Sequence, residues 1–170
     1  GATLPAAIRA ARYALYGEAA WRDTFNFEWI PERSGHYDWH IRPHMHEALI
    51  QVLLLTEGGA RVVINDAVWQ ARAPALLIVP ALSVHGFDFS RDVNGPVVTA
   101  AQRALESVVS VAMPALQTVL RTPAVLELAS APQAVEAMMP IFLAIEREAR
   151  APAPGQAAAG MGLLTALFVQ

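Results

Sequence analysis

The sequence contains no cysteine among its 170 residues. This absence excludes disulfide bridges and zinc sites built from thiolates. It fits a reducing compartment, and we expect a cytoplasmic protein. Any metal-binding hypothesis for this chain therefore has to rest on other ligands.

The chain also lacks a surplus of positive charge and a long apolar run. Lys and Arg together number 12, against 15 Asp and Glu, which gives a formal net charge of -3. By itself the chain is therefore a poor candidate for contact with nucleic-acid phosphates. No stretch approaches the roughly 18 uninterrupted apolar residues of a membrane span. With 55% hydrophobic and 16% charged residues, the composition predicts a folded, globular protein rather than a disordered one.

Short strands are predicted over much of the first hundred residues. Phe25, Phe27 and Trp29 alternate with polar residues, which is the period of a half-buried strand. Further strands are expected at residues 37–42, 48–55, 62–64, 68–70, 76–79, 84–89 and 97–101. About eight short strands in about 80 residues, separated by turn signals, are typical of an all-β barrel or sandwich.

Helices are predicted from about Ala104 onward, where the apolar period changes. Ser130 and Gln133 match an N-cap and its capping-box partner, with Pro132 in the first turn and Pro140 as a kink. A stiff linker follows, and then a last helix with one apolar side formed by Met161, Leu164 and Phe168. The fold class is therefore α+β, a β-barrel of about eight strands followed by two or more C-terminal helices.

Three parts of the chain are expected. Residues 1–23 form an N-terminal arm with Tyr13 and Tyr16 as docking residues, residues 24–104 the barrel, and residues 105–170 a helical segment. The chain begins at Gly1 without an initiator Met, which suggests a trimmed start. It ends in the apolar run 163–170 without a helix stop signal, so we expect the natural chain to continue.

Three histidines are the first candidates for a site. His44 and His46 are two residues apart, and His85 returns on a later strand. Such residues could meet inside a small barrel. They could hold a metal, bind a ligand without metal, or be structural. Gln51 is the only polar residue in the apolar run 48–55, so it is expected to point inward, hydrogen-bonded or aimed at a ligand.

Two phrases resemble known motifs. His44-Met45-His46, followed by Gln51 and Gly58, resembles the first cupin motif, and Pro80-Ala81-Leu82-Ser83-Val84-His85 resembles the second. Gln51 stands where metal-binding cupins usually have Glu, and Leu82 where they have Gly. The wider phrases around Arg42 and Phe87 resemble the sensor half of AraC-type bacterial transcription regulators. The phrases Leu15-Tyr16-Gly17-Glu18 and His85-Gly86-Phe87 resemble in particular the PobR-like branch, whose members respond to 4-hydroxybenzoate.

The resemblance implies a cupin-like effector-binding barrel, then dimerisation helices, then a helix-turn-helix part that is missing from this chain. It therefore implies a homodimer formed through the C-terminal helices from Ser130 onward, although these helices could instead pack on the barrel. Promoter DNA would be contacted only through the missing part. We expect no enzyme activity, no cofactor, no membrane contact, and a role as an activator that senses a small aromatic carboxylate, best 4-hydroxybenzoate.

Each site residue has two interpretations. Arg42 could pair with the effector carboxylate, or it could lie on the solvent face with Asp38 and His40. Trp39 and Phe87 could stack on the effector ring, or they could belong to the core. The expected ligand-binding set contains His44, His46, Gln51, His85, Arg42, Trp39 and Phe87.

Two other functions remain as alternatives. One is a metal-dependent cupin enzyme, a dioxygenase or isomerase, that uses His44, His46 and His85. Replacing Glu by Gln51 removes an anionic ligand, which weakens the hold on a divalent ion. The other is a dimerisation module whose barrel binds nothing.

Overall fold

The computed structural model describes residues 25–34, 39–44, 48–151 and 153–170. Within these residues it contains two antiparallel sheets and a set of helices. The strands are β1 (Phe25–Trp29), β2 (His40–His44), β3 (Leu49–Leu55), β4 (Gly59–Ile64), β5 (Ala67–Arg72), β6 (Ala75–Val79), β7 (His85–Phe89), β8 (Pro96–Ala101) and β9 (Ala124–Glu127). The helices are α2 (Ile30–Ser34), α3 (Gln102–Ala112), α4 (Leu116–Arg121), α5 (Pro132–Arg150) and α6 (Gln156–Val169).

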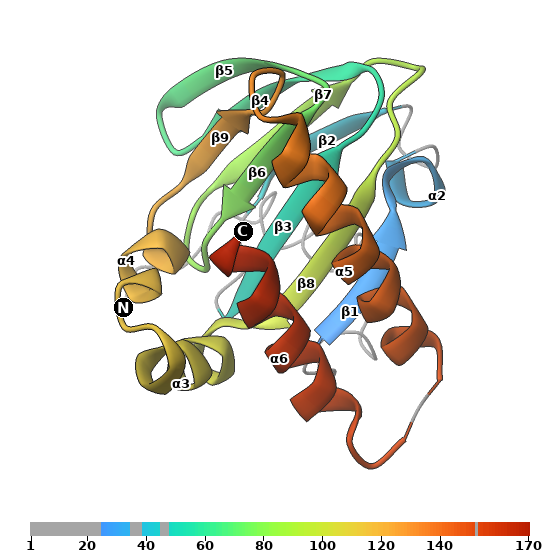
Figure 1. Cartoon of the computed structure of the whole chain (residues 1–170). Helices are drawn as coiled ribbons and strands as arrows, with labels where there is room; N and C mark the ends of the chain where they lie inside the picture. Colours follow the sequence, from blue (N-terminus) through green and yellow to red (C-terminus); the bar gives the residue numbers. More distant parts are fainter. Residues whose placement is uncertain (1–24, 35–38, 45–47, 152) are drawn as a thin grey trace.

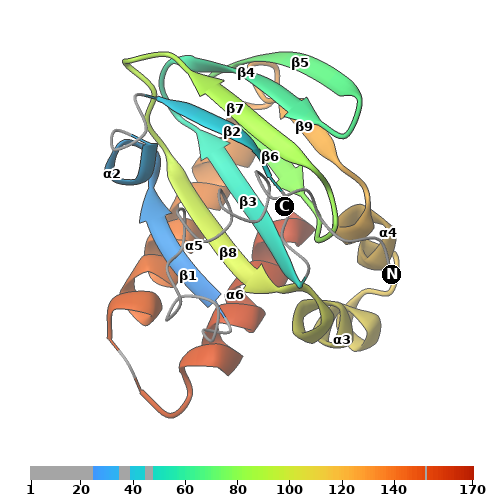
Figure 2. The same ribbon diagram turned by 180° about the vertical axis from the view of Figure 1, so that it is seen from behind.

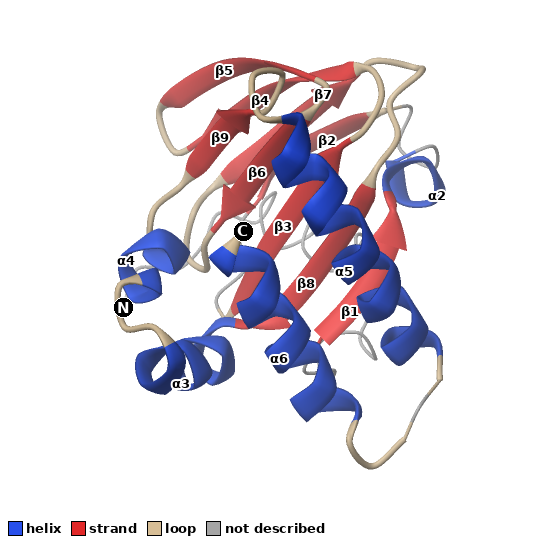
Figure 3. Ribbon diagram, in the orientation of Figure 1, coloured by secondary structure: helices blue, strands red, loops and turns tan. Residues whose placement is uncertain are grey.

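The two sheets differ in their cover. The five-stranded sheet has the order β1-β8-β3-β6-β9, and the four-stranded sheet has the order β2-β7-β4-β5. Helices α5 and α6 cross one face of the five-stranded sheet (Figure 1), and in the reverse view they lie behind it (Figure 2). Colouring by secondary structure separates the helical layer from the strands (Figure 3). The α+β class and the strand-rich first part followed by helices are thus confirmed, although hydrogen bonds do not close the described strands into one barrel.

Strand β3 shows why this sheet is buried on both faces. Its residues Leu49–Leu55 are all buried. Ile50, Val52 and Leu54 belong to a helix-side core, whereas Leu53 and Leu55 belong to an inter-sheet core. Successive side chains of a strand point to opposite faces, so the apolar run serves both layers. The helix-side core also includes Phe25, Phe27, Phe142, Ile145, Leu164 and Leu167, and the inter-sheet core includes Val62, Ile64, Leu77, Phe87 and Phe89.

Tight turns hold the strands in register. The hairpin between β4 and β5 pairs Ile64 with Ala67, so Asn65 and Asp66 form its two-residue turn. Asn65 has a left-handed backbone conformation, with a φ of 53°. Two-residue turns of this kind need such a conformation, which Gly or Asn usually adopts. Gly95 has a φ of 148°, and a Cβ there would lie 1.7 Å from the carbonyl oxygen of Leu54. Glycine is therefore required where β8 begins beside β3.

Some elements differ from the prediction. Strand β9 lies in the segment expected to be helical, and it pairs with β6 at the sheet edge. The short helix α2 was also not predicted. The predicted N-cap at Ser130 is wrong, because α5 is preceded by Ala131 and no side chain caps it. The backbone N–H of Ala131 donates to Leu128 in a turn, which leaves Ser130 outside the helix. Pro132 does lie in the first turn, and the helix continues through Pro140.

The apolar faces of α5 and α6 pack within the chain. Met138, Phe142, Met161 and Leu164 are buried in the helix-side core, and Met139 and Phe168 pack against it. These side chains were the reason to expect a dimer surface, and the five-stranded sheet covers them instead. The homodimer through the C-terminal helices stays a prediction, and Leu143 of α5 and Val169 of α6 are the larger apolar side chains that these helices still expose. Larger apolar side chains that remain exposed on α3 and α4 and between them include Val108, Val111, Met113 and Val119.

Candidate functional site

A cluster of buried polar side chains lies between the two sheets. It contains His44 of β2, His85 of β7, Gln51 of β3 and Thr99 of β8, each at most 6% exposed. The pairing of the strands brings them together, because His44 is opposite His85 and Gln51 is opposite Thr99. Gln51 and His85 then meet across the space between the sheets. We call these four residues the inter-sheet polar cluster.

Hydrogen bonds connect the members of the cluster. The His85 ring has Nδ1 2.9 Å from the carbonyl oxygen of Ser83 and Nε2 3.0 Å from Oε1 of Gln51. The other end of the Gln51 amide lies 3.4 Å from Oγ1 of Thr99. The rings of His44 and His85 are 4.2 Å apart between centroids, tilted by 56°. The cluster is thus one connected polar group inside an apolar layer.

The hydrogen-bond partners of His85 determine which of its ring nitrogens carry a proton. A backbone carbonyl only accepts, so Nδ1 of His85 carries the proton that is donated to Ser83. A neutral ring then needs a donor at Nε2, and the amide group of Gln51 supplies one when its NH₂ faces His85 and its oxygen faces the Thr99 hydroxyl. A doubly protonated ring instead needs an acceptor at Nε2. The structure has this amide orientation, with Oε1 of Gln51 at 3.0 Å from Nε2. Gln51 can therefore accompany His85 in either protonation state.

The space beside the cluster is small and apolar. A cavity of about 10 Å³ is lined by His44, Phe87, Phe89, Ile30, Ile41, Leu53 and Val97. Phe87 is buried, stacks on Phe89 at a centroid distance of 5.2 Å, and lies 5.7 Å from the His85 ring. A volume of that size holds one water at most, whereas an engineered cavity of about 150 Å³ holds benzene. This cavity, between the described residues that line it, is therefore too small for an aromatic ligand.

The structure places some predicted residues and not others. Gln51, His44, His85 and Phe87 lie inside, as described above. Trp39 is half-buried, packs against the inter-sheet core, and accepts a hydrogen bond from Phe89 N–H at 2.8 Å. The backbone of Arg42 belongs to β2, but its side chain lies outside the described part. His46, Asp38, Tyr13 and Tyr16 also fall outside the described residues.

One residue of the site, Thr99, and the partly buried carboxylate of Glu28 were missed by the sequence analysis. Thr99 bonds Gln51, and Glu28 of β1 shares its sheet face, because Glu28 is opposite Val97 of the inter-sheet core. Burial, with a smaller contribution from the charge of Glu32, raises the pKa of Glu28 from its ordinary value of 4.5 to about 7. The signal in the sequence that could have revealed the position of Glu28 is the alternation of apolar and polar residues in β1. Phe25 and Phe27 face the helices, so Asn26 and Glu28 face the other sheet rather than solvent.

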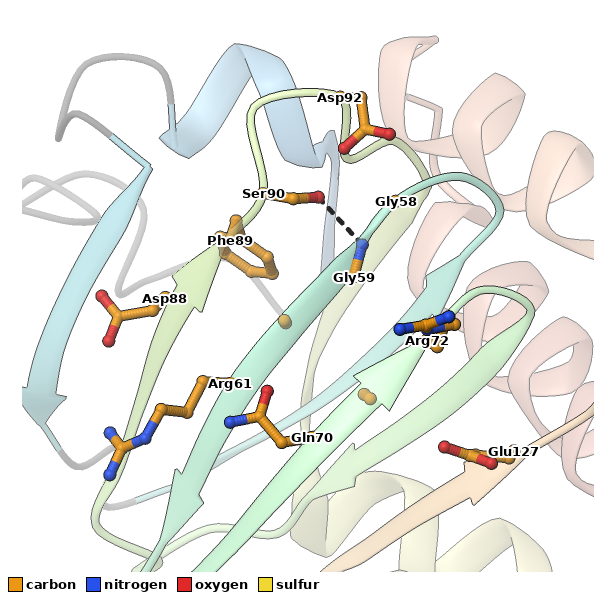
Figure 4. Close-up of a pocket in the computed structure, with 12 residues that line it drawn as sticks. Gly58, Gly59, Arg61, Gln70, Arg72, Asp88, Phe89, Ser90, Asp92 and Glu127 are labelled. Carbon is orange, nitrogen blue, oxygen red and sulfur yellow. Dashed lines mark hydrogen bonds between the residues drawn. The ribbon is translucent and has the colours of Figure 1, made fainter.

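A much larger hollow lies on the outer face of the four-stranded sheet. It has a volume of about 860 Å³ and is bordered by Arg61, Arg72, Asp88 and Glu127. Arg61 extends away from Arg72 and toward Asp88 (Figure 4). The charged residues on its border are of both signs, and we assign no ligand to this hollow. On the same face His40 bonds Asp88 across the strands.

The described donor set does not suit a divalent metal ion. Among residues 25–34, 39–44, 48–151 and 153–170, no group of three His, Cys, Asp or Glu side chains could hold one. His44 and His85 contribute two imidazoles, and Gln51 contributes a neutral amide, which is a weaker ligand for a divalent ion than a carboxylate. His46, the third residue of the proposed set, is outside the described part. The absence of a metal stays a prediction.

Helices of the described part include none that is both long and apolar enough to cross a membrane. No protein-family model matches the sequence, and no curated protein matches it. The similarities that were found are to solved structures.

Three of these solved chains illustrate the level of similarity. A predicted oxalate decarboxylase from Thermotoga maritima is 14% identical, with a TM-score of 0.34 over 36% of this chain and 56% of that one. The Cnp3 cupin domain of Schizosaccharomyces pombe is 12% identical, with a TM-score of 0.35 over 41% and 52%. The AraC-like transcriptional activator CuxR is 14% identical, with a TM-score of 0.42 over 73% and 43%. This chain thus spans about half the length of the solved chains it matches.

The described part of the chain has an α+β fold. Two antiparallel sheets enclose a common core, and helices follow the strands. The TM-scores are below 0.5, so function has to be argued from the residues of this chain.

Proposed function

We propose that this chain is the effector-binding domain of an AraC-type transcription regulator and senses a small aromatic carboxylate. The effector that we favour is 4-hydroxybenzoate. The observation that carries the proposal is the inter-sheet polar cluster. It places His85, Gln51 and Thr99 within a buried apolar layer, with the ring of Phe87 beside them. Apolar walls with a few converging polar groups are the usual composition of a small-molecule site.

The cluster suits an anionic ligand. A carboxylate that leaves water for an apolar interior needs a charged partner or several hydrogen bonds. A second proton on His85 would be accepted by Oε1 of Gln51, which lies 3.0 Å from Nε2, and Thr99 adds a hydroxyl donor. Phe87 and Phe89 supply aromatic faces for a benzoate ring. Arg42, His46 and Trp39 belong to this proposal as further ligand contacts.

The small cavity beside the cluster fits a sensor that changes shape. A cavity of about 10 Å³ cannot accept a benzoate ring, so binding requires an expanded arrangement of the side chains between the sheets. A ligand that binds only that arrangement shifts the population toward it. We propose that this shift is passed to a homodimer and to a DNA-binding part beyond this chain, with activation of transcription as the outcome and without metal or catalysis.

The second candidate is a metal-dependent cupin enzyme that uses His44, His46 and His85. The observation in its favour is the close approach of the His44 and His85 rings, 4.2 Å between centroids. Metal analysis of the purified chain separates the two candidates. Stoichiometric iron, nickel or manganese that disappears in the His44→Ala variant would favour the enzyme. A metal-free chain that binds an aromatic acid would favour the sensor.

Calorimetry with 4-hydroxybenzoate tests the proposed effector directly. Benzoate and phenol serve as comparison ligands, since each lacks one of the two polar groups. We expect heat of binding for 4-hydroxybenzoate and a weaker response to phenol, because phenol has no carboxylate. Replacing Gln51 by Leu should weaken binding about tenfold or more, the effect of one lost buried hydrogen bond, while Gln70→Leu on the exposed face of β5 leaves it unchanged. Absence of heat from folded protein at millimolar ligand would refute the effector assignment.

A further inference from the structure

Gln102, the first residue of α3, contacts both motif-bearing segments of the site and the end of α4. Its Oε1 accepts a hydrogen bond from the N–H of Ala81 at 2.6 Å, inside the second motif. Its Nε2 donates to the carbonyl oxygen of Leu120 at 3.1 Å. Its backbone N–H donates to the carbonyl of Ala48 at 3.0 Å, between His46 and Gln51 of the first motif. Gln102 is 9% exposed.

The loop held by Gln102 also holds His85. The N–H of Ser83 donates to Pro80 at 3.3 Å, and the carbonyl of Ser83 accepts from Nδ1 of His85. Leu82, which lies between Pro80 and Ser83 in this loop, has a φ of 67°, a left-handed backbone conformation that is rare for a leucine. The loop therefore has a tightly defined shape, fixed at one end by His85 and in its middle by Gln102.

Helix α4 is bonded by the other end of the Gln102 amide. Leu120 is fully buried in the helix-side core together with Leu116, and the Gln102 amide bonds its carbonyl, which lies in the last turn of the helix. The last carbonyls of a helix lack partners within the helix, so a side-chain donor there fixes its position. Figure 1 shows α3 and α4 together at the end of the sheet where β8 leads into α3.

We propose that Gln102 is a positioning residue that couples the state of the inter-sheet polar cluster to helix α4. A change at His85 moves the carbonyl of Ser83 and the loop around Ala81. Gln102 carries that displacement to Leu120 because one amide bonds both backbones. This role deepens the proposed function, since it gives the sensor a route from its interior to its helices. The coupling itself exists with or without a bound effector.

A double-mutant cycle measured by hydrogen exchange tests the coupling without a ligand. Gln51→Leu removes the partner of His85, and Gln102→Ala removes both side-chain bonds of Gln102. The readout is the exchange rate of α4 amides divided by that of α5 amides, which corrects for a general loss of stability. We expect Gln51→Leu to raise this ratio about threefold or more in the otherwise unchanged protein, and to leave it unchanged in the Gln102→Ala background.

Two further variants make the result decisive. Gln102→Glu keeps an acceptor for Ala81 but loses the donor to Leu120, so it should also abolish the coupling, and it replaces Gln102→Ala if that variant does not fold. Ser107→Ala removes a hydrogen bond that stays within α3, from Ser107 to Arg103, and should leave the coupling intact. An equal response to Gln51→Leu with and without Gln102, or no response at all, overturns the proposal.

Adding 4-hydroxybenzoate separates this proposal from the proposed function. If the effector binds, it should change the α4 ratio in the unchanged protein and not in the Gln102 variants. If no heat of binding is found but the ligand-free cycle shows coupling, the effector assignment fails and the role of Gln102 stands. If the effector binds while the cycle shows no coupling, the opposite holds.

Discussion

The two cores of this protein share one sheet but differ in chemistry. The helix-side core is built from apolar side chains of α5, α6 and the five-stranded sheet, and the Thr165 hydroxyl of α6 donates to the carbonyl of Met161 in its own helix. The inter-sheet core is apolar over most of its extent but ends in the polar cluster of His44, Gln51, His85 and Thr99. The first layer is therefore almost purely apolar, whereas the second gives up some apolar packing for buried hydrogen-bonding groups, the ones we propose bind a ligand.

The largest effect is expected in the helix-side core. Phe142→Ala removes a fully buried ring between α5 and the sheet, and should lower the free energy of unfolding by about 3–5 kcal/mol. Urea denaturation followed by circular dichroism measures the loss. Leu143→Ala, at the next position and 43% exposed, is the control and should change stability by about 0.5 kcal/mol or less. Similar losses for both variants would mean that α5 does not pack as described.

A smaller loss is expected in the polar part of the inter-sheet core. Gln51→Leu keeps a side chain of similar length but deprives His85 and Thr99 of a partner. Leaving buried polar groups unsatisfied costs about 1–3 kcal/mol. The same replacement at exposed Gln70 is the matched control, with an expected change within about 0.5 kcal/mol. If Gln51→Leu stabilises the protein, the cluster is not a hydrogen-bonded unit.

The pH dependence of stability should report Glu28. Its carboxyl titrates near 4.5 when exposed and near 7 in the folded protein, chiefly because of burial and secondly because of Glu32. The folded state thus holds the proton to higher pH. Stability is unaffected below the lower value, falls as the pH rises from 4.5 to about 7, and is level above that range. Because Glu28 is only partly buried, solvent screening reduces this loss in the free energy of unfolding to the order of 1–2 kcal/mol.

Thermal unfolding between pH 4 and pH 8 measures this loss. Glu28→Gln, which cannot ionise, should flatten the decline, while Glu127→Gln at an exposed position of β9 should leave it as it is. A decline of equal size in Glu28→Gln would assign the pH dependence to other groups.

The comparison of the two cores also explains what the sequence could predict. The strands β1 to β8 were predictable because apolar alternation and turn residues are local signals. Strand β9 was not, since Ala124–Glu127 is short and becomes a strand only by pairing with β6. Sequence periodicity indicates that a helix such as α5 has an apolar face. It does not indicate whether a sheet of the same chain or a second chain covers that face.

The site was predictable in part for the same reason. Gln51 stood out as a single amide in an apolar run, and its burial confirms that it points inward. Glu28 looked like the solvent side of a half-buried strand, because the second sheet that covers this face is distant in sequence. Gln102 carried no local signal, since its role depends on three backbone groups from separate parts of the chain.

The smallest expected effect concerns the rim of the helix-side core. The indole N–H of Trp29 donates to Glu146 at 2.6 Å, and Arg150 pairs with the same carboxylate at 3.1 Å. Glu146→Ala removes both contacts and should cost about 1 kcal/mol, whereas Glu146→Gln keeps an acceptor for Trp29 and should cost about half as much or less. Urea denaturation at low and high salt distinguishes the two contacts, because salt screens the exposed ion pair and not the indole hydrogen bond. A loss in Glu146→Ala as large as that in Gln51→Leu would contradict the view that buried polar groups matter mainly between the sheets.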